Sequence, residues 1–441
     1  MGHIDEWVPI KCAAKEGSAL DDTPGPMRKS MQAARDRRGL RAGNTGEAGL
    51  PQVLLVGLGW PVPTFIARRV AVLADLGVPV VVACDRRAAK DVLPKGVRVV
   101  REMSRARGLL ALACRSATRP GQVAALLREI PGTGREKLYF LSRHPYLVSI
   151  SKPNLIHQQW IGSAQTWATV ARALGVPLVA SARGSQVTLE PHDARKRLTI
   201  QRCLAAADAV HCVSDSILER CAVLGAEREK LFVNYGGIDT ERFATLAGRM
   251  NRTSDADTLR LVTVGSLIAR KNVAAQLLVL RSLRDAGVSA NLTVVGGGPD
   301  ELALKQMASC LGVGEAVEFA GAQPDDAVIR HLQAADVCLS TSVAEGLANS
   351  ILEAASCGLP VVVFDCEGMR EVIQDGSTGF VVPFGDLAGM VDRLTILAKD
   401  SAARLALGAA GREWVRARFE ARRCAQEMIE HYRRIVSRRK W

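Results

Sequence analysis

STSVAEGLANSILEAASCGLPVVVFD, residues 340–365, contains the repeating unit on which the rest of the chain is built. A short apolar strand begins this stretch, a loop follows, residues 349–357 form a predicted helix, and PVVVF forms the next strand. Short apolar runs separated by amphipathic helices are typical of parallel strands whose sheet is covered on both faces. The stretch therefore predicts one strand–helix–strand unit of a doubly wound sheet.

The same alternation continues in both directions. Toward the N-terminus it includes the strand patterns QVLLVG, PVVVAC, NLIHQQW, PLVASARG and DAVHCVS, with helices predicted over 64–76, 164–174 and 195–206. It restarts at RLVTVGS and continues through ANLTVVGGG and AVEFAG. A chain of 441 residues suits two domains of roughly 200 residues each. The predicted fold class is α/β, with two doubly wound Rossmann-like domains facing each other across a cleft, where ligands of such folds bind.

Changes in composition give the predicted domain boundaries. Residues 1–50 mix charges with Gly, Pro, Ser and Asp without a sustained period, which predicts a mobile N-terminal tail. The first domain is predicted at 51–240 and a polar linker at 241–258. The second domain follows at 259–385, and residues 386–441 are predicted to be helices that return toward the first domain.

Composition also narrows the class of protein. The chain is 48% hydrophobic and 23% charged, which is ordinary for a globular protein. No apolar run approaches the ~18 residues needed to span a bilayer, and the N-terminus has no basic segment followed by an apolar stretch. Eleven scattered cysteines without a C-x-x-C pair indicate a reducing compartment. We therefore expect a cytoplasmic protein.

Positive charge is concentrated in the first domain. The net charge is +13, and residues 51–240 hold 26 basic against 14 acidic side chains. A basic surface attracts anionic partners, so we expect peripheral contact with an anionic membrane, at its inner face, through residues 51–240. The alternative is a solvated, arginine-rich surface. Nucleic acid is not expected as a partner, because aromatic residues are only 4% of the chain and no binding motif occurs.

Two glutamates, Glu345 and Glu353, stand eight positions apart in the opening stretch. A continuous helix would separate them by roughly 12 Å, beyond the ~5–9.5 Å between the carboxylates of glycosidases. The pair instead suits two ends of one ligand, with Glu345 in the loop facing a sugar and Glu353 in the helix accepting hydrogen bonds from a ribose diol. The free N–H groups of the helix start would then point at phosphate.

Five segments together resemble the retaining glycosyltransferases of family 4, which have the GT-B fold of two Rossmann domains. The Glu345–Glu353 pair resembles their paired-glutamate motif. The other segments are VNYGGIDTERF (233–243), VGSLIARKN (264–272), VVGGGP (294–299) and CEGMREVIQDGSTGFVVPFGD (366–386). The resemblance implies transfer of a hexose-type sugar from a UDP- or GDP-linked donor, with retention of configuration and with no metal or other cofactor. It also implies an acceptor-side first domain and a nucleotide-sugar-binding second domain.

The resemblance assigns roles to individual residues. Lys271 is implied to contact the donor diphosphate, Glu345 the hydroxyls of the donor sugar, and Glu353 the ribose. Arg270 would add a second positive charge, and backbone amides would bind phosphate at the remaining donor-binding positions, which are Gly57, Gly59, Gly346, Asn349 and Ser350. The implied catalytic residues are Glu345, Lys271 and Arg183. The alternatives are a solvated helix start for Arg270 and Lys271, and an ordinary strand-to-helix turn for the two glycines of the first domain.

The chain departs from the family pattern in the first domain and at one donor position. SARGSQVT has Arg183 and Gln186 where relatives commonly have His and Asp, and Ser266 stands where they usually have Arg. Arg183 could hold sugar hydroxyls, donor phosphate or an anionic acceptor, but a guanidinium does not act as a base. His157 in NLIHQQW is interpreted as either an acceptor contact or a structural histidine.

The residues leave the donor and the acceptor open, because UDP- and GDP-sugars share the diphosphate and ribose that these motifs contact. The basic first domain favours a glycan or lipid-linked acceptor in cell-surface polysaccharide or glycolipid assembly. The alternatives are glycosylation of a soluble specialised metabolite and a non-catalytic nucleotide-sugar-binding protein. A nicotinamide-dependent dehydrogenase is not predicted, because Gly57-Leu-Gly59 lacks the third glycine of a dinucleotide fingerprint.

Overall fold

The computed structural model describes residues 49–59, 62–84, 97–144, 146–149, 153–244 and 258–438. Nearly all of the predicted tail at 1–50 lies outside the described residues. So does most of the predicted linker at 241–258, whose first residues belong to the short helix α10 (Thr240–Ala244).

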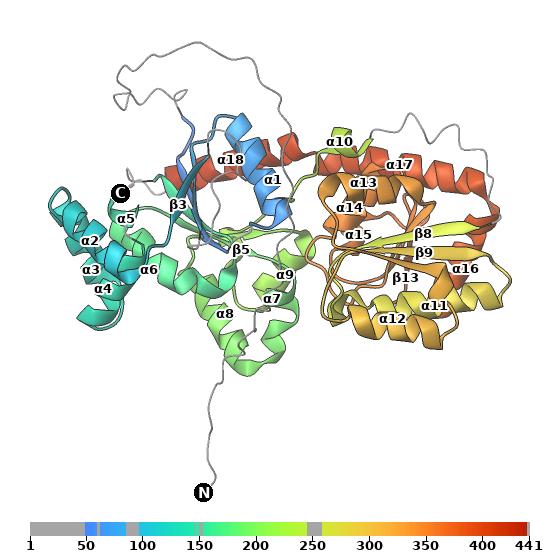
Figure 1. The fold of residues 1–441 in the computed structure, drawn as a ribbon. Helices are drawn as coiled ribbons and strands as arrows, with labels where there is room; N and C mark the ends of the chain where they lie inside the picture. Colours follow the sequence, from blue (N-terminus) through green and yellow to red (C-terminus); the bar gives the residue numbers. More distant parts are fainter. Residues whose placement is uncertain are drawn as a thin grey trace, which may run out of the picture. The chain divides into compact units, whose positions relative to one another are not determined.

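The first domain, on the left of Figure 1, is built on a parallel sheet. Its strand order is β3-β2-β1-β4-β5-β6-β7. Its strands are β1 (Val53–Leu58), β2 (Val80–Cys84), β3 (Arg98–Arg101), β4 (Leu155–Gln158), β5 (Leu178–Ala182), β6 (Ala209–Cys212) and β7 (Leu231–Val233). Every residue of β2, β4, β5 and β6 is buried, as expected for strands covered on both faces. The chain reverses its direction of winding between β1 and β4, which is the switch point where α/β folds bind ligands.

Helices surround this sheet. They are α1 (Thr64–Asp75), α2 (Arg105–Ser116), α3 (Pro120–Glu129), α4 (Gly134–Arg143), α5 (Tyr146–Ser149), α6 (Ala164–Leu174), α7 (Ser185–Thr188), α8 (Ala194–Ala206) and α9 (Asp215–Val223), with 3₁₀ turns η1 (Ile161–Ser163), η2 (Glu190–His192) and η3 (Arg228–Lys230). The three helices predicted from periodicity are present as α1, α6 and α8. The helices α2–α5 and the edge strands β3 and β7 were not predicted.

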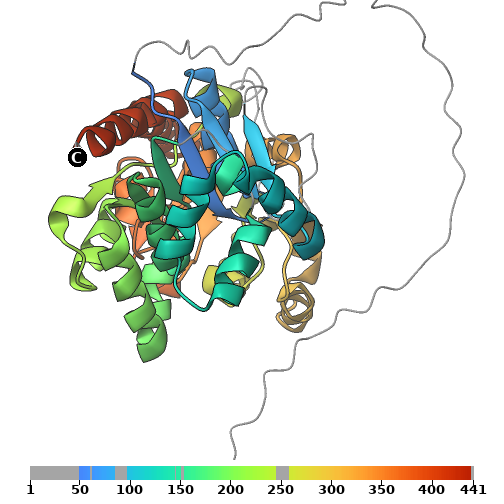
Figure 2. The same cartoon turned by 90° about the vertical axis from the view of Figure 1, so that its left-hand side faces the viewer.

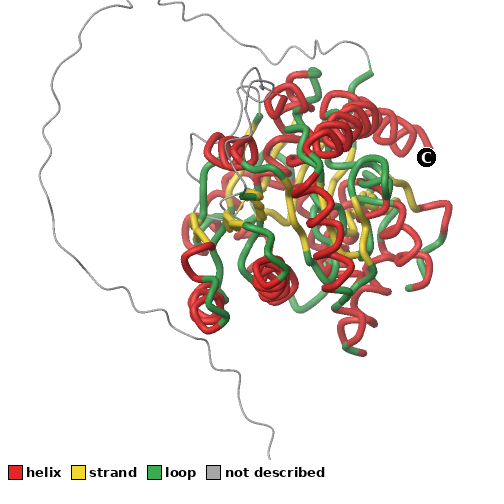
Figure 3. The backbone as a smooth tube through the Cα atoms, turned by 90° about the vertical axis from the view of Figure 1, so that its right-hand side faces the viewer, coloured by secondary structure: helices red, strands yellow, loops and turns green. Residues whose placement is uncertain are grey.

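The second domain repeats the same topology, with the strand order β10-β9-β8-β11-β12-β13 and all pairs parallel. The strands are β8 (Leu259–Val264), β9 (Ala290–Val295), β10 (Val317–Gly321), β11 (Val337–Ser340), β12 (Val361–Phe364) and β13 (Phe380–Val382). The connecting helices are α11 (Val273–Asp285), α12 (Glu301–Cys310), α13 (Asp325–Ala334), α14 (Asn349–Ser356) and α15 (Met369–Val372), with 3₁₀ turns η4 (Ala269–Lys271) and η5 (Gly314–Ala316). Figure 3 shows these strands between layers of helices. The predicted pair of doubly wound domains is confirmed.

The chain ends in three helices, α16 (Leu387–Lys399), α17 (Ser401–Phe419) and α18 (Ala421–Arg438). α17 packs on α14 of the second domain, whereas α18 packs beside α1 of the first (Figures 1 and 2). Met428 and Tyr432 of α18 are fully buried in the core cluster that also contains strands β1 and β2. The last helix is therefore part of the first domain's core, although it follows the second domain in sequence.

The two domains share buried contacts. One apolar cluster includes Val213 after β6 of the first domain and Leu347 and Ala348 before α14 of the second. None of the described helices has both the length and the apolar character needed to cross a membrane.

Candidate active site

The carboxyl ends of β8 and β11, at the switch point of the second sheet, bring three predicted site residues together. The Lys271 ammonium lies 2.6 Å from Glu345 Oε1, and the Arg270 guanidinium lies 3.1 Å from Glu345 Oε2. Arg270 also donates to the Ala344 carbonyl at 2.8 Å. The Glu345 side chain is only 8% exposed. Each of its two oxygens therefore accepts a charge-assisted bond from a different cation.

The backbone fixes the two loops that carry these charges. The Val343 amide donates to the Arg270 carbonyl at 2.9 Å, and the Thr341 hydroxyl donates to the Asn272 carbonyl at 2.8 Å. Asn272 adopts the left-handed conformation, with φ 49°, which ends η4 and begins α11. Asn tolerates this conformation better than most residues do. Lys271 and Glu345 are thus positioned by rigid turns.

Glycines make room for Lys271. Gly265 follows β8 with φ 157°, and a Cβ at that position would lie 3.2 Å from the Lys271 Cε atom. A Cβ at Gly296, in the next glycine turn, would collide with the Gly265 carbonyl oxygen. The neighbouring small hollow is lined by residues that include Ser266 and Ser340. Ser266, where the family usually has Arg, therefore faces the same hollow as Lys271.

Gly346 meets the first domain. A Cβ on Gly346 would lie only 2.5 Å from the Gly184 amide nitrogen, so the two glycine backbones pack directly against each other. Gly368 also packs on the Gly346 carbonyl, from a third loop. The Gly346 backbone, whose amide was predicted to bind phosphate, thus lies in contact with the backbone of two other loops.

The helix α14 begins immediately after this contact. Its N-cap is Ala348, and no side chain caps the helix start. The Asn349 amide donates to the Leu347 carbonyl, and its side chain lies near Gly236 of the segment between the domains. Within the described part of the chain the Ser350 amide makes no backbone hydrogen bond, which suits the predicted phosphate contact.

Arg183 is buried next to Gly184. It donates from Nε to the Gln159 carbonyl at 3.1 Å and from Nη2 to Gln159 Oε1 at 3.0 Å. Its guanidinium lies 5.2 Å from the centre of the Phe65 ring and 5.8 Å from that of Trp160. Burial, followed by repulsion from Arg69, lowers the pKa of Arg183 to about 9. The guanidinium therefore stays charged at pH 7 and is held by contacts with side chains of the first domain.

Glu353 contacts the first domain rather than the other predicted site residues. Its Oε1 atom lies 2.6 Å from Nη1 of Arg68 on α1, and Nη2 of Arg68 lies 2.8 Å from Asp325 at the start of α13. Burial raises the pKa of Glu353, and attraction to Arg68 opposes that rise. Arg68 was not predicted as a site residue, because a local sequence pattern cannot indicate a contact between residues 285 positions apart.

A second set of bonds joins the domains at α9 of the first domain. The Glu371 carboxylate accepts from the Asp215 and Ser216 amides at 2.8 and 2.9 Å, at the N-terminus of α9. Glu367 pairs with Arg220 on the same helix. A carboxylate at a helix N-terminus is favoured by the helix dipole. Both glutamates belong to residues 366–386, one of the five segments that resemble the family.

His157 lies in the interior of the first domain and is 1% exposed. Its Nδ1 lies 2.6 Å from the Tyr432 hydroxyl, and its Nε2 lies 2.8 Å from the Ser181 hydroxyl. The Ser181 oxygen also lies 2.8 Å from His211 Nδ1, and His211 Nε2 lies 2.8 Å from the Asn234 carbonyl. Both ring nitrogens of His157 are therefore engaged. This geometry favours the structural interpretation of His157 over acceptor contact.

With both rings neutral, the short contacts suit one arrangement of protons. The Asn234 carbonyl can only accept, so His211 Nε2–H donates to it at 2.8 Å and His211 Nδ1 accepts from Ser181. Arg69 Nη1 lies farther from the same Nε2 atom, at 3.5 Å. Ser181 in turn accepts from His157 Nε2–H, and the Tyr432 hydroxyl donates to His157 Nδ1. Both histidines are neutral, in agreement with pKa values that burial holds well below the usual range. The network connects α18 to β4, β5 and β6.

The two predicted glycines of the first domain lie after β1. Gly57 has φ 77°, and a Cβ there would collide with the Gln158 side-chain amide on the adjacent strand β4. Gly59 is exposed. In the described residues no hydrogen bond joins either glycine to the second domain. Their contact with donor phosphate stays a prediction.

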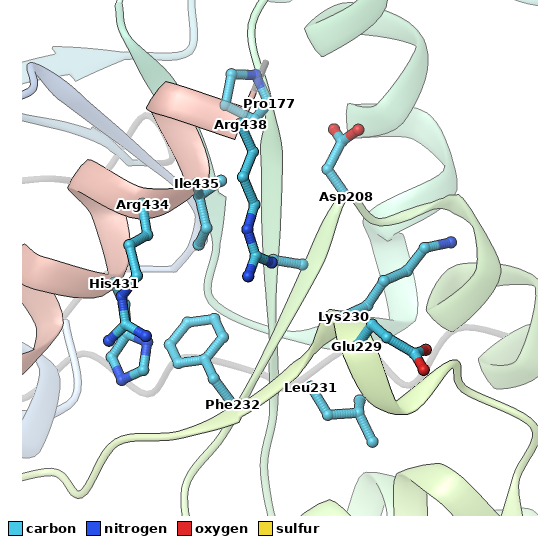
Figure 4. A pocket seen from close by; sticks show the side chains of 11 residues that line it. Pro177, Asp208, Glu229, Lys230, Leu231, Phe232, His431, Arg434, Ile435 and Arg438 are labelled. Carbon is cyan, nitrogen blue, oxygen red and sulfur yellow. The ribbon is translucent and has the colours of Figure 1, made fainter. Parts of the chain in front are cut away.

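A separate hollow of about 300 Å³ lies at the amino ends of β5, β6 and β7, beneath α18. Figure 4 shows Arg434 and Arg438 of α18 on one side and Asp208, Glu229 and Lys230 on the other. None of the predicted site residues lines it. Among the described residues, no group of three His, Cys, Asp or Glu side chains could hold a metal ion; independence from metal remains a prediction.

Family models match both domains. The Glycosyltransferase Family 4 model matches residues 62–242, and the Glycosyl transferases group 1 model matches residues 249–414.

Individual proteins are similar as well. A GDP-mannose-dependent alpha-(1-6)-phosphatidylinositol monomannoside mannosyltransferase of Mycolicibacterium smegmatis is 31% identical over 303 residues, 63% of this chain and 79% of the relative. The putative colanic acid biosynthesis glycosyltransferase WcaL of Escherichia coli K12 is 28% identical over 200 residues, 44% of this chain and 48% of the relative.

The fold is also found in solved structures. The crystal structure of Anabaena HepE in complex with UDP matches with a TM-score of 0.69 at 17% identity, over 87% of this chain and 99% of that one. At this identity the match shows the fold alone. The two family models and the extensive match to the mycobacterial relative show that this chain belongs to glycosyltransferase family 4, with the GT-B fold.

Proposed function

We propose that this glycosyltransferase moves a hexose-type sugar from a UDP- or GDP-linked donor to an acceptor in cell-surface polysaccharide or glycolipid assembly, with retention of configuration. The observation that carries the proposal is the arrangement of Lys271 and Arg270 on Glu345 beside the uncapped start of α14. Two fixed cations and a helix N-terminus are suited to a diphosphate leaving group. They would take the place of a divalent metal.

The proposed reaction transfers the sugar in one step at the anomeric carbon. The acceptor oxygen forms a bond to the anomeric carbon while the bond from that carbon to the donor phosphate breaks. The nucleoside diphosphate leaves with the bonding electrons, and Lys271 and Arg270 stabilise its charge. The acceptor proton passes to the departing phosphate oxygen. Attack on the face that the leaving group vacates gives retention, and no covalent intermediate on the protein is needed.

The remaining residues would hold the substrates. Glu345 would accept hydrogen bonds from donor-sugar hydroxyls and keep Lys271 oriented, and Glu353 would accept from the ribose. Arg183 is the first-domain side chain at the junction with Gly346, and its positive charge suits an anionic group of the acceptor or the donor. As a guanidinium it can be neither base nor nucleophile.

The acceptor class is supported by the relatives and by charge. The mycobacterial relative is named for a phosphatidylinositol monomannoside substrate, and WcaL is named for colanic acid biosynthesis. The excess positive charge of residues 51–240 suits an anionic or membrane-bound acceptor. Peripheral membrane contact is part of this proposal. It predicts salt-sensitive binding to anionic vesicles and weaker binding to neutral ones.

The first test is calorimetric titration of the full chain with UDP, GDP and ADP in the presence of EDTA. Binding of one nucleotide, weakened in Glu353→Ala, is expected and identifies the donor class. Sugar transfer is then measured with the matching nucleotide sugars and a membrane lipid extract, for the parent chain and for Glu345→Gln. Full transfer by Glu345→Gln would overturn the role of Glu345. Binding without any transfer would favour the non-catalytic alternative, which the departures at Arg183 and Gln186 motivate.

A further inference from the structure

Arg68 is a first-domain residue whose contacts lie in the second domain. It projects from α1 and bridges two carboxylates, Glu353 on α14 and Asp325 on α13, at 2.6 and 2.8 Å. Its guanidinium also lies 5.5 Å from the centre of the Phe243 ring in α10. Desolvation opposes the charge of Arg68, but attraction to the two carboxylates outweighs it and raises the pKa of Arg68. The side chain is therefore held by contacts in three elements outside its own helix.

This contact engages only one of the two oxygens of the Glu353 carboxylate. Oε1 accepts from Arg68, whereas no hydrogen bond to Oε2 occurs among the described residues. The Glu353 side chain also keeps 11% of its surface exposed. One oxygen is thus fixed by the first domain, and the other is available to a ligand.

We propose that Arg68 is a positioning residue that orients Glu353 to accept the hydroxyls of the donor ribose. This inference rests on the proposed function of Glu353. A ribose diol donates hydrogen bonds, so the carboxylate must be ionised and correctly rotated to accept them. Burial alone disfavours the ionised form. The Arg68 bridge supplies the compensating charge and removes the freedom of the carboxylate to rotate.

The arrangement also makes ribose recognition depend on both domains. The cation belongs to α1, and the carboxylate belongs to α14, so the oriented state of Glu353 exists only when the two domains are in contact. Ribose recognition by Glu353 would therefore be complete only while α1 of the first domain contacts α14 of the second. A purely structural ion pair would join the domains without affecting which nucleotide groups are recognised.

The test separates these two roles by the chemistry of the probe. Calorimetric affinities are measured for the nucleoside diphosphate that binds, UDP, GDP or ADP, and for its 2′,3′-dideoxy form. We expect Arg68→Met to weaken binding of the ribonucleotide by about tenfold, the size of a lost hydrogen bond to a charged group. Binding of the dideoxy form is expected to change little. Arg68→Lys, which keeps the charge but loses the fork that bridges both carboxylates, is expected to fall between the two.

Arg242→Met is the matched control. Arg242 pairs with Asp325 at 3.4 Å and Asp326 at 2.8 Å, and its charge favours the ionised form of Glu353 less than that of Arg68 does. This variant disturbs the same network and should change the ratio of the two affinities less than Arg68→Met does. Circular dichroism and thermal unfolding establish whether each variant is folded. If Arg68→Met does not fold, the comparison is made with Arg68→Lys.

The outcomes distinguish the inference from the proposed function. If Glu353→Ala does not reduce the preference for the ribonucleotide, the ribose role of Glu353 fails. If Glu353→Ala abolishes that preference and Arg68→Met preserves it, Arg68 is not a positioning residue. Equal weakening of both nucleotides by Arg68→Met, or tighter binding of the ribonucleotide, would also overturn the inference. Loss of the preference in both variants, without further loss in the double variant, supports it.

Discussion

The two sheets of this protein have the same winding but differ in what lies near their switch points. In the second domain, the loops after β8 and β11 present Lys271 and Glu345 as charged side chains beside a small hollow. In the first domain, the neighbouring strands β4 and β5 carry His157 and Ser181, which are neutral and sealed inside a hydrogen-bond chain. Under the proposed function, the charged groups of the second sheet contact the donor, whereas the neutral network of the first sheet supports its core.

The difference follows from where the polar groups find partners. The first-domain network is completed by Tyr432 of α18, so its polar atoms need no ligand. In the second domain, Arg270 and Lys271 pair with the single carboxylate of Glu345, and the uncapped start of α14 follows it in the chain. A site that must accept an anion keeps donors available, whereas a core satisfies them internally.

Removing Lys271 would have the largest effect. We expect Lys271→Met to lower kcat/KM by about 10²–10³-fold, because one fixed charge on the leaving group is lost at a preorganised site. The measurement is steady-state transfer with the donor identified by calorimetry. Lys305→Met is the control, since Lys305 forms an exposed helical pair with Glu301 on the same domain. Comparable loss in both variants would contradict a specific role for Lys271.

Substitution of Gly346 tests whether close contact of the two domains is needed. The added methyl of Gly346→Ala would lie 2.5 Å from the Gly184 amide nitrogen and 3.2 Å from a Val213 methyl, so the loops must separate. We expect turnover to fall at least about tenfold, since a displacement near 1 Å can cost ~10²-fold. Gly134→Ala is the control, because a Cβ there meets no atom within 4 Å. Unchanged turnover in Gly346→Ala would show that this contact is dispensable.

The smallest effect concerns pH and the buried histidines. Burial lowers the pKa of His157 and His211, so the unfolded chain binds protons more readily than the folded chain. Their stabilising contribution is complete above the unfolded pKa of about 6.5 and is lost as pH falls below it, by about 1.4 kcal/mol per histidine at pH 5.5. The thermal unfolding midpoint should fall between pH 7.5 and 5.5.

Controls separate this effect from surface electrostatics. His192 is exposed, so His192→Gln should retain the same acid destabilisation. Added salt should change it little, because buried groups are screened less than exposed ones. A midpoint that stays constant from pH 7.5 to 5.5 would contradict the neutral, buried state assigned to the two histidines.

Much of the fold was predictable from local sequence. Periodicity predicted the helices that became α1, α6 and α8, and the buried strands of both sheets, because these elements follow from runs of apolar residues. The region containing α2–α5 was not predicted. α4, for example, has only two buried residues.

The site was predictable only within each domain. The contact of Lys271 with Glu345 joins two motifs that the resemblance had already placed in one pocket. Arg68, by contrast, has no motif of its own and gains its partners only when α1 of the first domain meets α13 and α14 of the second. From its neighbours in sequence, His157 could be either an acceptor contact or a structural histidine.

By itself, the sequence determined two doubly wound domains, the family, and the residues that line the second switch point. These depend on patterns within short segments, and short-range patterns reflect local backbone preference and burial. The tertiary structure decided that α18 completes the core of the first domain, that Gly184 packs on Gly346, and that Arg68 reaches Glu353. Those contacts join residues far apart in the chain, and their partners are set by the packing of whole elements rather than by any segment alone.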